Sequence, residues 1–290
     1  MNHLISTIKF RDQPLVNCIA TSLLAFVLTI PMHELFHLLT FYAYGFGDQV
    51  TIFSATCVGF DETQVDFQSL APFHRIMAAG GSASILNAII GLGVFFILIR
   101  CRMGSMMRVF LIQLMGAHLA TGFGYFMCAP MNFGDWGVVF NSFPDAPGLV
   151  QTLKVVLCVI GVVGTMFSFF ALNYMSYYFI EGPSNKKERL YVALRLHLSM
   201  LLVGLLAGLI GGSVSPASGG DIFAAIFGNM MWIVFFWGFL FTWFMVKHPK
   251  ESRFLYPLPQ QPYHLLLVIG ILLVLIDLII LGPGLVINSK

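Results

Sequence analysis

Long apolar runs constrain this chain more than any other feature of its sequence. A helix of about 20 apolar residues crosses the hydrocarbon core of a bilayer with all its backbone hydrogen bonds made internally. Composition agrees, because 58% of the residues are hydrophobic and only 10% are charged, whereas soluble domains carry about 25% charged residues. The sequence therefore predicts an all-α polytopic membrane protein with about seven transmembrane helices. We place these spans at 15–44, 73–99, 109–129, 150–178, 191–212, 222–246 and 264–286.

Lys and Arg are distributed unevenly over the segments between the spans. None lies in the alternate loops 45–72, 130–149 and 213–221. The other loops and the N-terminal segment hold Lys9, Arg11, Arg100, Arg102, Arg108, Lys186, Lys187, Arg189, Lys247, Lys250 and Arg253. Because cytoplasmic loops carry an excess of Lys and Arg, the pattern predicts a cytoplasmic N-terminus and a C-terminus outside. The sequence has no run of basic residues, so we expect no nucleic acid as a partner, and the apolar spans predict the lipid bilayer as one.

The motif His33-Glu34-Leu35-Phe36-His37 lies inside the first apolar span. Helix residues four apart lie one above the other, so both imidazoles face one point, as two ligands of a zinc ion do. Glu34 is placed to take a proton from a water molecule that the zinc ion activates. Ionisable side chains at membrane depth are costly and mark functional sites. The alternative is that the two histidines are structural and that Glu34 is their hydrogen-bond partner.

A catalytic zinc ion uses three protein ligands and keeps a fourth position for water. Asp135 is the best third candidate, because it is the lone carboxylate of the apolar segment 127–139 and a dication would offset its desolvation. The flanking Gly134 and Gly137 allow the backbone to turn tightly. The alternative is that Asp135 caps a short helix that begins near Trp136. Glutamate as the third ligand is disfavoured, because the candidates lie among cytoplasmic-type charges: Glu181, Glu188 and Glu251.

Two more polar side chains lie within the apolar spans. We expect His118, in the third span, either to act in catalysis or to support a metal ligand, the alternative being a hydrogen bond to a neighbouring carbonyl. Asn87, in the second span, could donate a hydrogen bond to the oxyanion that forms on a scissile carbonyl. Both are therefore candidate catalytic residues beside Glu34.

The segment Gln49 to Phe60 is rich in Val, Thr, Ile and Phe, which predicts one or two short strands after the first span. A strand beside a membrane active site could hold an extended peptide by pairing along its edge. The alternative, which we weigh equally, is an ordinary hairpin that packs on the helix ends.

Taken together, these residues resemble the site-2 protease family of intramembrane zinc metalloproteases. In that family a Gly follows the second His by eight residues, as Gly45 follows His37, and a short β segment ends in Gly-Phe, as at Gly59-Phe60. A Pro also precedes the ligand Asp by five residues, as Pro130 precedes Asp135. The resemblance covers roughly residues 20–140.

Parts of the family pattern are altered here. Ala79-Gly80-Gly81 stands where the family has Ala-Gly-Pro, and Asn87 comes slightly later than the family Asn. The resemblance implies a three-helix core that binds zinc through His33, His37 and Asp135, with Glu34 as general base. Family members usually hold zinc nearer the cytoplasmic face, whereas the charge pattern puts this motif in the outer half of the bilayer.

These inferences divide the chain into a catalytic membrane core, 1–148, with helices 1–3, the β segment and the Asp loop, and additional helices 4–7, 149–290. The expected function is hydrolysis of peptide bonds in membrane-embedded or membrane-adjacent substrates, with Zn²⁺ as cofactor. No separate substrate-reading domain is visible, so selection would fall to the membrane part or to a regulatory partner protein. The alternative is a non-enzymatic transporter or metal-binding protein that uses the same cluster.

Overall fold

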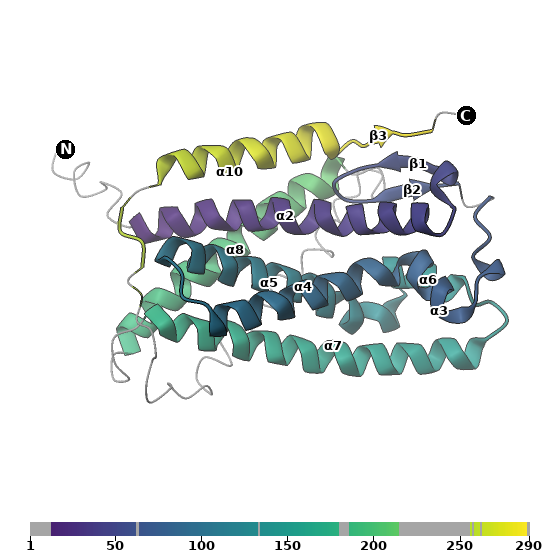
Figure 1. The fold of residues 1–290 in the computed structure, drawn as a ribbon, viewed down its shortest axis with the longest axis horizontal. Helices are drawn as coiled ribbons and strands as arrows, with labels where there is room; N and C mark the ends of the chain where they lie inside the picture. The colour runs from purple at the N-terminus through teal and green to yellow at the C-terminus, as the bar shows by residue number, and fades with distance from the viewer. Residues whose placement is uncertain are drawn as a thin grey trace.

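The computed structural model describes residues 13–61, 64–132, 134–179, 186–214, 256, 258–261 and 263–288. Long helices that run roughly along one axis make up most of it (Figure 1). The elements are, in chain order, α2 (Gln13–Ala43), η1 (Gly47–Gln49), β1 (Val50–Phe53), β2 (Val58–Phe60), η2 (Phe67–Ser69), α3 (Pro72–Ile76), η3 (Met77–Gly81), α4 (Ser82–Arg100), α5 (Ser105–Cys128), η4 (Ala129–Met131), α6 (Asp135–Asn141), α7 (Pro147–Ser176), η5 (Tyr177–Phe179), α8 (Lys186–Val214), α10 (His264–Ile276), η6 (Asp277–Leu281) and β3 (Leu285–Val286).

Six helical stretches among the described residues are long and apolar enough to cross a membrane. They are Pro14–Ala43, Pro72–Arg100, Ser105–Met131, Pro147–Phe179, Leu190–Gly211 and His264–Leu281. Each coincides with a predicted span to within a few residues, which confirms a mainly helical, multi-pass membrane protein. The remaining predicted span, 222–246, lies outside the described residues.

The first three spans pack against one another, and glycines allow their backbones to approach closely. A Cβ on Gly122 of α5 would lie 2.6 Å from the Ala88 nitrogen of α4, and one on Gly91 would lie 2.6 Å from Leu119 Cδ2. α7 crosses α5 in the same way, because a Cβ on Gly161 would overlap the backbone of α5. Small residues at such crossings are how membrane helices reach close packing.

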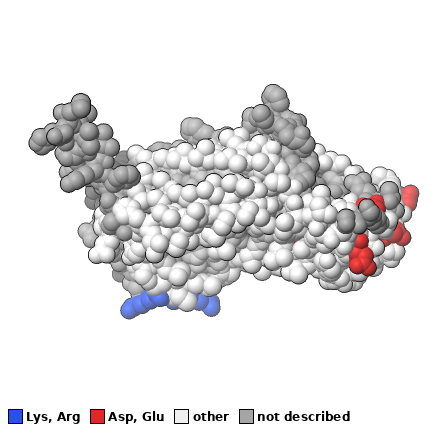
Figure 2. All heavy atoms as spheres, turned by 90° about the horizontal axis from the view of Figure 1, so that it is seen from above, with Lys and Arg blue, Asp and Glu red and all other residues white. Residues whose placement is uncertain are grey.

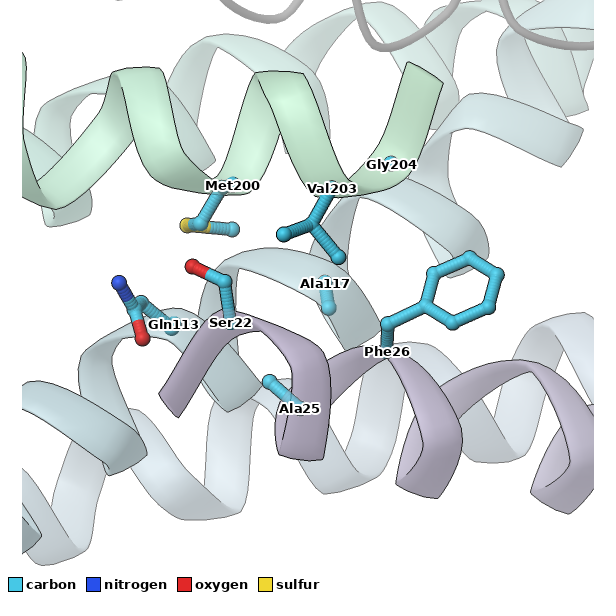
Figure 3. Close-up of a pocket in the computed structure, with 8 residues that line it drawn as sticks. All are labelled: Ser22, Ala25, Phe26, Gln113, Ala117, Met200, Val203 and Gly204. Atoms are coloured by element: carbon cyan, nitrogen blue, oxygen red, sulfur yellow. The ribbon is translucent and has the colours of Figure 1, made fainter. Parts of the chain in front are cut away.

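A buried polar contact fixes α2 against α5 and α8. Gln113 Nε2 donates to the Cys18 carbonyl (3.0 Å) and to Ser199 Oγ (3.1 Å), and Ser22 Oγ donates to Ser199 Oγ (3.0 Å). A gap lined by Ser22, Gln113 and Phe26, among others, lies beside this contact and has a volume of about 10 Å³ (Figure 3). Such a volume holds about one water molecule at most. The gap is therefore packing space between three helices and is too small for a ligand.

The chain also forms a small antiparallel sheet of strand order β2-β1-β3. β1 and β2 form an antiparallel hairpin where one or two short strands were predicted, and Ser54 Oγ holds its turn by accepting from the Thr56 and Cys57 amides, both at 3.0 Å. Phe60 packs on Phe41 near the end of α2, with ring centroids 5.0 Å apart, so the hairpin does pack on a helix end. β1 is paired on both edges, so an added peptide strand could pair only with β2 or β3.

The predicted end of the last span is wrong. The helix stops at Leu281, and residues 285–286 form β3 instead. Pro283 cannot donate to a helix carbonyl, and Gly284 adopts a positive φ of 91°, so the chain leaves the helix here. Beyond β3, the Ile287 amide donates to the Thr51 carbonyl at 2.9 Å, which ties the end of the described chain to β1.

The two ends of the helix bundle differ in charge. We call the end that carries β1 and β2 the sheet end, and the end that carries Arg100 and Arg102 the basic end. On the face in Figure 2, Lys and Arg gather at one end and Asp and Glu at the other. Arg108, also at the basic end, is 0% exposed and donates to the carbonyls of Leu98 and Cys101. α2 starts at the basic end and β3 lies at the sheet end, so the described chain starts and finishes at opposite ends (Figure 1).

Candidate metal centre

Three side chains from two distant segments meet inside the bundle. His33 and His37 lie on α2, and Asp135 begins α6, 102 residues after His33. Asp135 Oδ2 lies 3.0 Å from His33 Nε2 and 3.2 Å from His37 Nε2, and the two Nε2 atoms are 3.3 Å apart. Both histidines are buried, and the Asp135 side chain is 17% exposed. Within the described part of the chain, these three form a group able to hold a metal ion.

The spacing of the three atoms fits a zinc ion. Nitrogen and oxygen ligands lie about 2.0–2.1 Å from zinc and therefore roughly 3.3 Å from one another in a tetrahedral site. The three separations are close to that value, and two imidazoles with one carboxylate match the donors zinc prefers. The same separations also describe two imidazoles hydrogen-bonded to one carboxylate. The geometry thus permits a metal ion without requiring one.

Two tight turns bring Asp135 to the histidines. After α5 ends, Asn132 and Gly134 adopt positive φ values of 58° and 59°, and α6 then begins with Asp135. The N-cap residue of α6 is Gly134, with no side-chain capping bond. Asp135 therefore does not cap this helix, which was the alternative reading of its sequence, and its carboxylate contacts the two imidazoles instead.

The kinked start of the second span packs directly on Asp135. Gly80, in η3, has a φ of 143°, and a Cβ there would lie 2.9 Å from both the Cβ and the carbonyl oxygen of Asp135. A side chain at this position would be strained by its backbone angle and would also push against Asp135. A Cβ on the next residue, Gly81, would lie 3.3 Å from the ring of Trp136. The Gly80-Gly81 pair thus seats the start of α6.

Asp135 lies outside the membrane-spanning helices, and its surroundings favour the ionised carboxylate. Burial raises the pKa of this carboxyl, but the facing imidazoles of His37 and His33 outweigh that effect and hold the pKa well below its usual range. A metal ion binds the ionised form of a carboxylate. The ionised carboxylate is thus the form in which Asp135 could serve as a ligand.

Glu34 lies beside the group without being part of it. The residue is only 6% exposed, and its carboxylate is close enough to interact electrostatically with His33, His37 and Asp135. It is not among the residues whose ligand atoms converge. That position suits a group that accepts a proton next to a metal ion, as the sequence motif predicts.

Asn87 and His118 lie behind His33. Asn87 Nδ2 is 2.7 Å from His33 Nδ1, the ring nitrogen that does not face Asp135, and Asn87 Oδ1 is 2.6 Å from His118 Nδ1. Both residues are buried, at 0% and 1% exposure. The structure thus connects the two predicted residues to the group through His33, and neither contributes an atom to the point where the three ligand atoms meet.

Sequence reasoning missed one aromatic contact of the group. The Tyr125 ring stacks on the His33 ring, with centroids 5.0 Å apart and an interplanar angle of 27°. A Cβ on Gly134 would lie 3.0 Å from the same ring. A signal was present, because Tyr125 follows His118 by seven residues, which is two helical turns and therefore the same face of α5.

Comparison of the chain with protein-family models, with curated proteins and with solved structures found no match. Two imidazoles and a carboxylate can hold a dication, and a neighbouring carboxylate can move a proton.

Gly80→Ala should weaken zinc binding by roughly 10–100-fold, the loss typical when a support of a metal ligand is disturbed. The added methyl group would displace Asp135 from the two imidazoles. The affinity is measured by competition with a chromophoric chelator. Gly93→Ala is the matched control, because its Cβ would meet nothing within 4 Å. Equal zinc affinity in both variants would show that Gly80 does not seat Asp135.

Proposed function

We propose that this protein is an intramembrane zinc metalloprotease of the site-2 protease type. The observation that carries the proposal is the convergence of His33 Nε2, His37 Nε2 and Asp135 Oδ2 at separations of 3.0–3.3 Å. Three such ligands leave a fourth position open, as catalytic zinc sites do. Glu34 stands beside this group in a helix long and apolar enough to cross a membrane.

Each residue has a distinct role in the proposed reaction. His33, His37 and Asp135 hold Zn²⁺, which when bound supplies the Lewis-acid chemistry that activates water for attack on a peptide carbonyl. Glu34 accepts the proton of the attacking water as the oxygen–carbon bond forms. It delivers that proton to the leaving nitrogen as the carbon–nitrogen bond breaks, so that the carboxylate is regenerated.

The proposed substrates are membrane-embedded or membrane-adjacent peptides. His33 precedes the end of α2 by ten residues, or about 15 Å at the helical rise of 1.5 Å per residue, so the group lies in the sheet-end half of the bundle. A helical substrate must unwind locally to expose a carbonyl, and the outer edges of β2 and β3 could hold the unwound segment. A partner protein that selects substrates is compatible with this arrangement.

The test measures metal and cleavage on one preparation of the full chain in detergent micelles. We expect about one zinc ion per chain by mass spectrometry of the metal. We also expect cleavage of labelled single-span peptides with a central Gly-Pro, lost on adding 1,10-phenanthroline and restored by zinc. Bound zinc without cleavage would favour the metal-binding or transport alternative. A chain that binds no zinc would refute the site.

We also propose that the sheet end faces outside and the basic end faces the cytoplasm, on the Lys and Arg distribution between the loops. Among the described residues, Arg75 and Lys154 are cations at the sheet end. Arg75 donates to the Ser142 carbonyl at 3.2 Å, and Lys154 lies over the Phe140 ring.

A reporter fused after Lys290 should therefore report an outside location. In bacterial cells, a C-terminal alkaline phosphatase fusion should be active and a C-terminal green fluorescent protein fusion should be dark. The same two reporters placed before Met1 serve as the control and should give the reverse. A fluorescent, phosphatase-inactive C-terminus would invert the proposed topology.

A further inference from the structure

A continuous chain of hydrogen bonds runs from His33 through Asn87 to His118. It joins α2, α4 and α5, and its contacts measure 2.7 Å and 2.6 Å. All three side chains are at most 2% exposed. We propose that Asn87 and His118 are positioning residues that select the His33 tautomer able to bind metal, and that Asn87 turns its amide when the metal binds. The proposal rests on the metal centre proposed above and deepens it.

The two ring nitrogens of His33 face different partners. Nε2 faces Asp135 and His37, so a metal ion there needs the lone pair of Nε2. A neutral imidazole then carries its proton on Nδ1, and that N–H requires an acceptor. The side-chain amide of Asn87 is within reach, because its Nδ2 lies 2.7 Å from His33 Nδ1. For metal binding, Asn87 must therefore turn its oxygen toward His33.

In the structure, the Ala83 carbonyl fixes the orientation of the Asn87 amide. Asn87 Nδ2 lies 3.0 Å from the Ala83 carbonyl oxygen, which can only accept a hydrogen bond. This contact keeps Nδ2 on the side of His33 and Oδ1 on the side of His118. Asn87 then donates to His33 Nδ1, and the proton of a neutral His33 lies on Nε2, where it is donated to Asp135. The three contacts of the Asn87 amide are thus mutually consistent in this orientation.

Metal binding at His33 would reverse the orientation of the Asn87 amide. When the amide turns by 180°, Oδ1 accepts from His33 Nδ1–H and Nδ2 donates to His118 Nδ1. His118 must then carry its proton on Nε2, although it does not touch the metal. The contact with Ala83 is given up, and no net charge changes at Asn87 or His118. Metal binding at His33 is thus coupled to the tautomer of a histidine on another helix.

The variants that test this differ in the hydrogen bonds that the replacing side chain can form. Asn87→Leu removes the hydrogen bonds to His33 and His118, whereas Asn87→Asp keeps an acceptor facing His33. His118→Leu removes the outer partner, whereas His118→Asn keeps an amide atom close to the position of Nδ1. His197→Leu is the matched control, because His197 is a buried histidine that contacts Ser176 Oγ at 2.9 Å and lies outside the chain of contacts.

Zinc affinity is measured on the full chain in micelles by chelator competition. We expect Asn87→Leu to bind zinc 10–100-fold more weakly, Asn87→Asp to retain binding, and His197→Leu to match the unmodified chain. His118→Leu should weaken binding and His118→Asn should restore it, a rescue that a packing role would not produce. Cobalt(II) bound in place of zinc should keep its visible spectrum in His118→Asn and lose intensity in Asn87→Leu.

Nitrogen-15 spectra of histidine-labelled protein add a readout independent of affinity. Zinc should move the His118 proton from Nδ1 to Nε2, with the signal assigned through the His118→Asn variant. Unchanged zinc affinity in Asn87→Leu, equal affinity in the two His118 variants, or a His118 tautomer indifferent to zinc would each overturn this proposal and leave the metal centre standing. An unmodified chain without zinc affinity would overturn the metal centre itself, and this proposal with it.

Discussion

Asp135→Ala and His37→Ala should each abolish zinc binding and peptide cleavage together. Each variant leaves two ligands where a catalytic site needs three. Disturbing a residue that only supports a ligand already costs 10–100-fold in affinity, so loss of a ligand should cost more than about 100-fold. Within the described residues, no fourth His, Cys, Asp or Glu joins the group to take over. Zinc content is measured by mass spectrometry, and affinity by chelator competition.

The control for the ligand variants is another histidine at the sheet end. His74 is exposed, and its Nδ1 contacts the Tyr44 hydroxyl at 3.0 Å, away from the group. His74→Ala should keep one zinc ion per chain and full cleavage. If Asp135→Ala and His37→Ala both keep their zinc as well, the ligand set is wrong and the three side chains are only a buried hydrogen-bonded cluster.

Glu34→Gln should retain zinc while cleavage falls by roughly 10²–10⁴-fold, the usual contribution of a general base. The amide has nearly the shape of the carboxylate, so the buried position should still be filled. It cannot accept and return a proton, however, so the water is no longer activated. Cleavage of the labelled peptides is followed under single-turnover conditions, and zinc is measured on the same sample.

The outcome for Glu34→Gln distinguishes a general base from a structural partner of the two histidines. Retained zinc with unchanged cleavage would remove Glu34 as the base. Loss of zinc would instead indicate that Glu34 supports the two histidines as their partner, the structural role considered from the sequence. Only retained zinc with lost cleavage would agree with the proposed mechanism.

The membrane architecture was largely predictable because the signal for it is local. Each span is a continuous apolar run, and a helix satisfies its own backbone within that run. The six spans among the described residues could thus be placed from the sequence to within a few residues. Among the described residues, the largest departure is at the last boundary, where Pro283 and Gly284 end the helix and β3 pairs with a strand more than 200 residues earlier. The predicted span 222–246 lies outside the described residues.

In the candidate site, too, the local part was predictable from the sequence and the long-range part was not. His33 and His37 share a helix face because they are four residues apart, which any helix would impose. Asp135 could be singled out as a lone carboxylate in an apolar segment, but the contact it makes spans 102 residues. The turns at Asn132 and Gly134 and the backbone contact at Gly80 are what carry it to the imidazoles.

By itself, the sequence determined the positions of the six apolar helices among the described residues, the paired histidines with Glu34 between them, and the presence of a short β segment after the first span. Only the tertiary structure decided that Asp135 completes the group, that Asn87 and His118 stand behind His33, and that Tyr125 stacks on it. The first set follows from periodicities of the backbone, which act over a few residues. The second depends on how α2, α4 and α5 pack at their glycine crossings, where contacts between distant residues are set by shape and not by spacing.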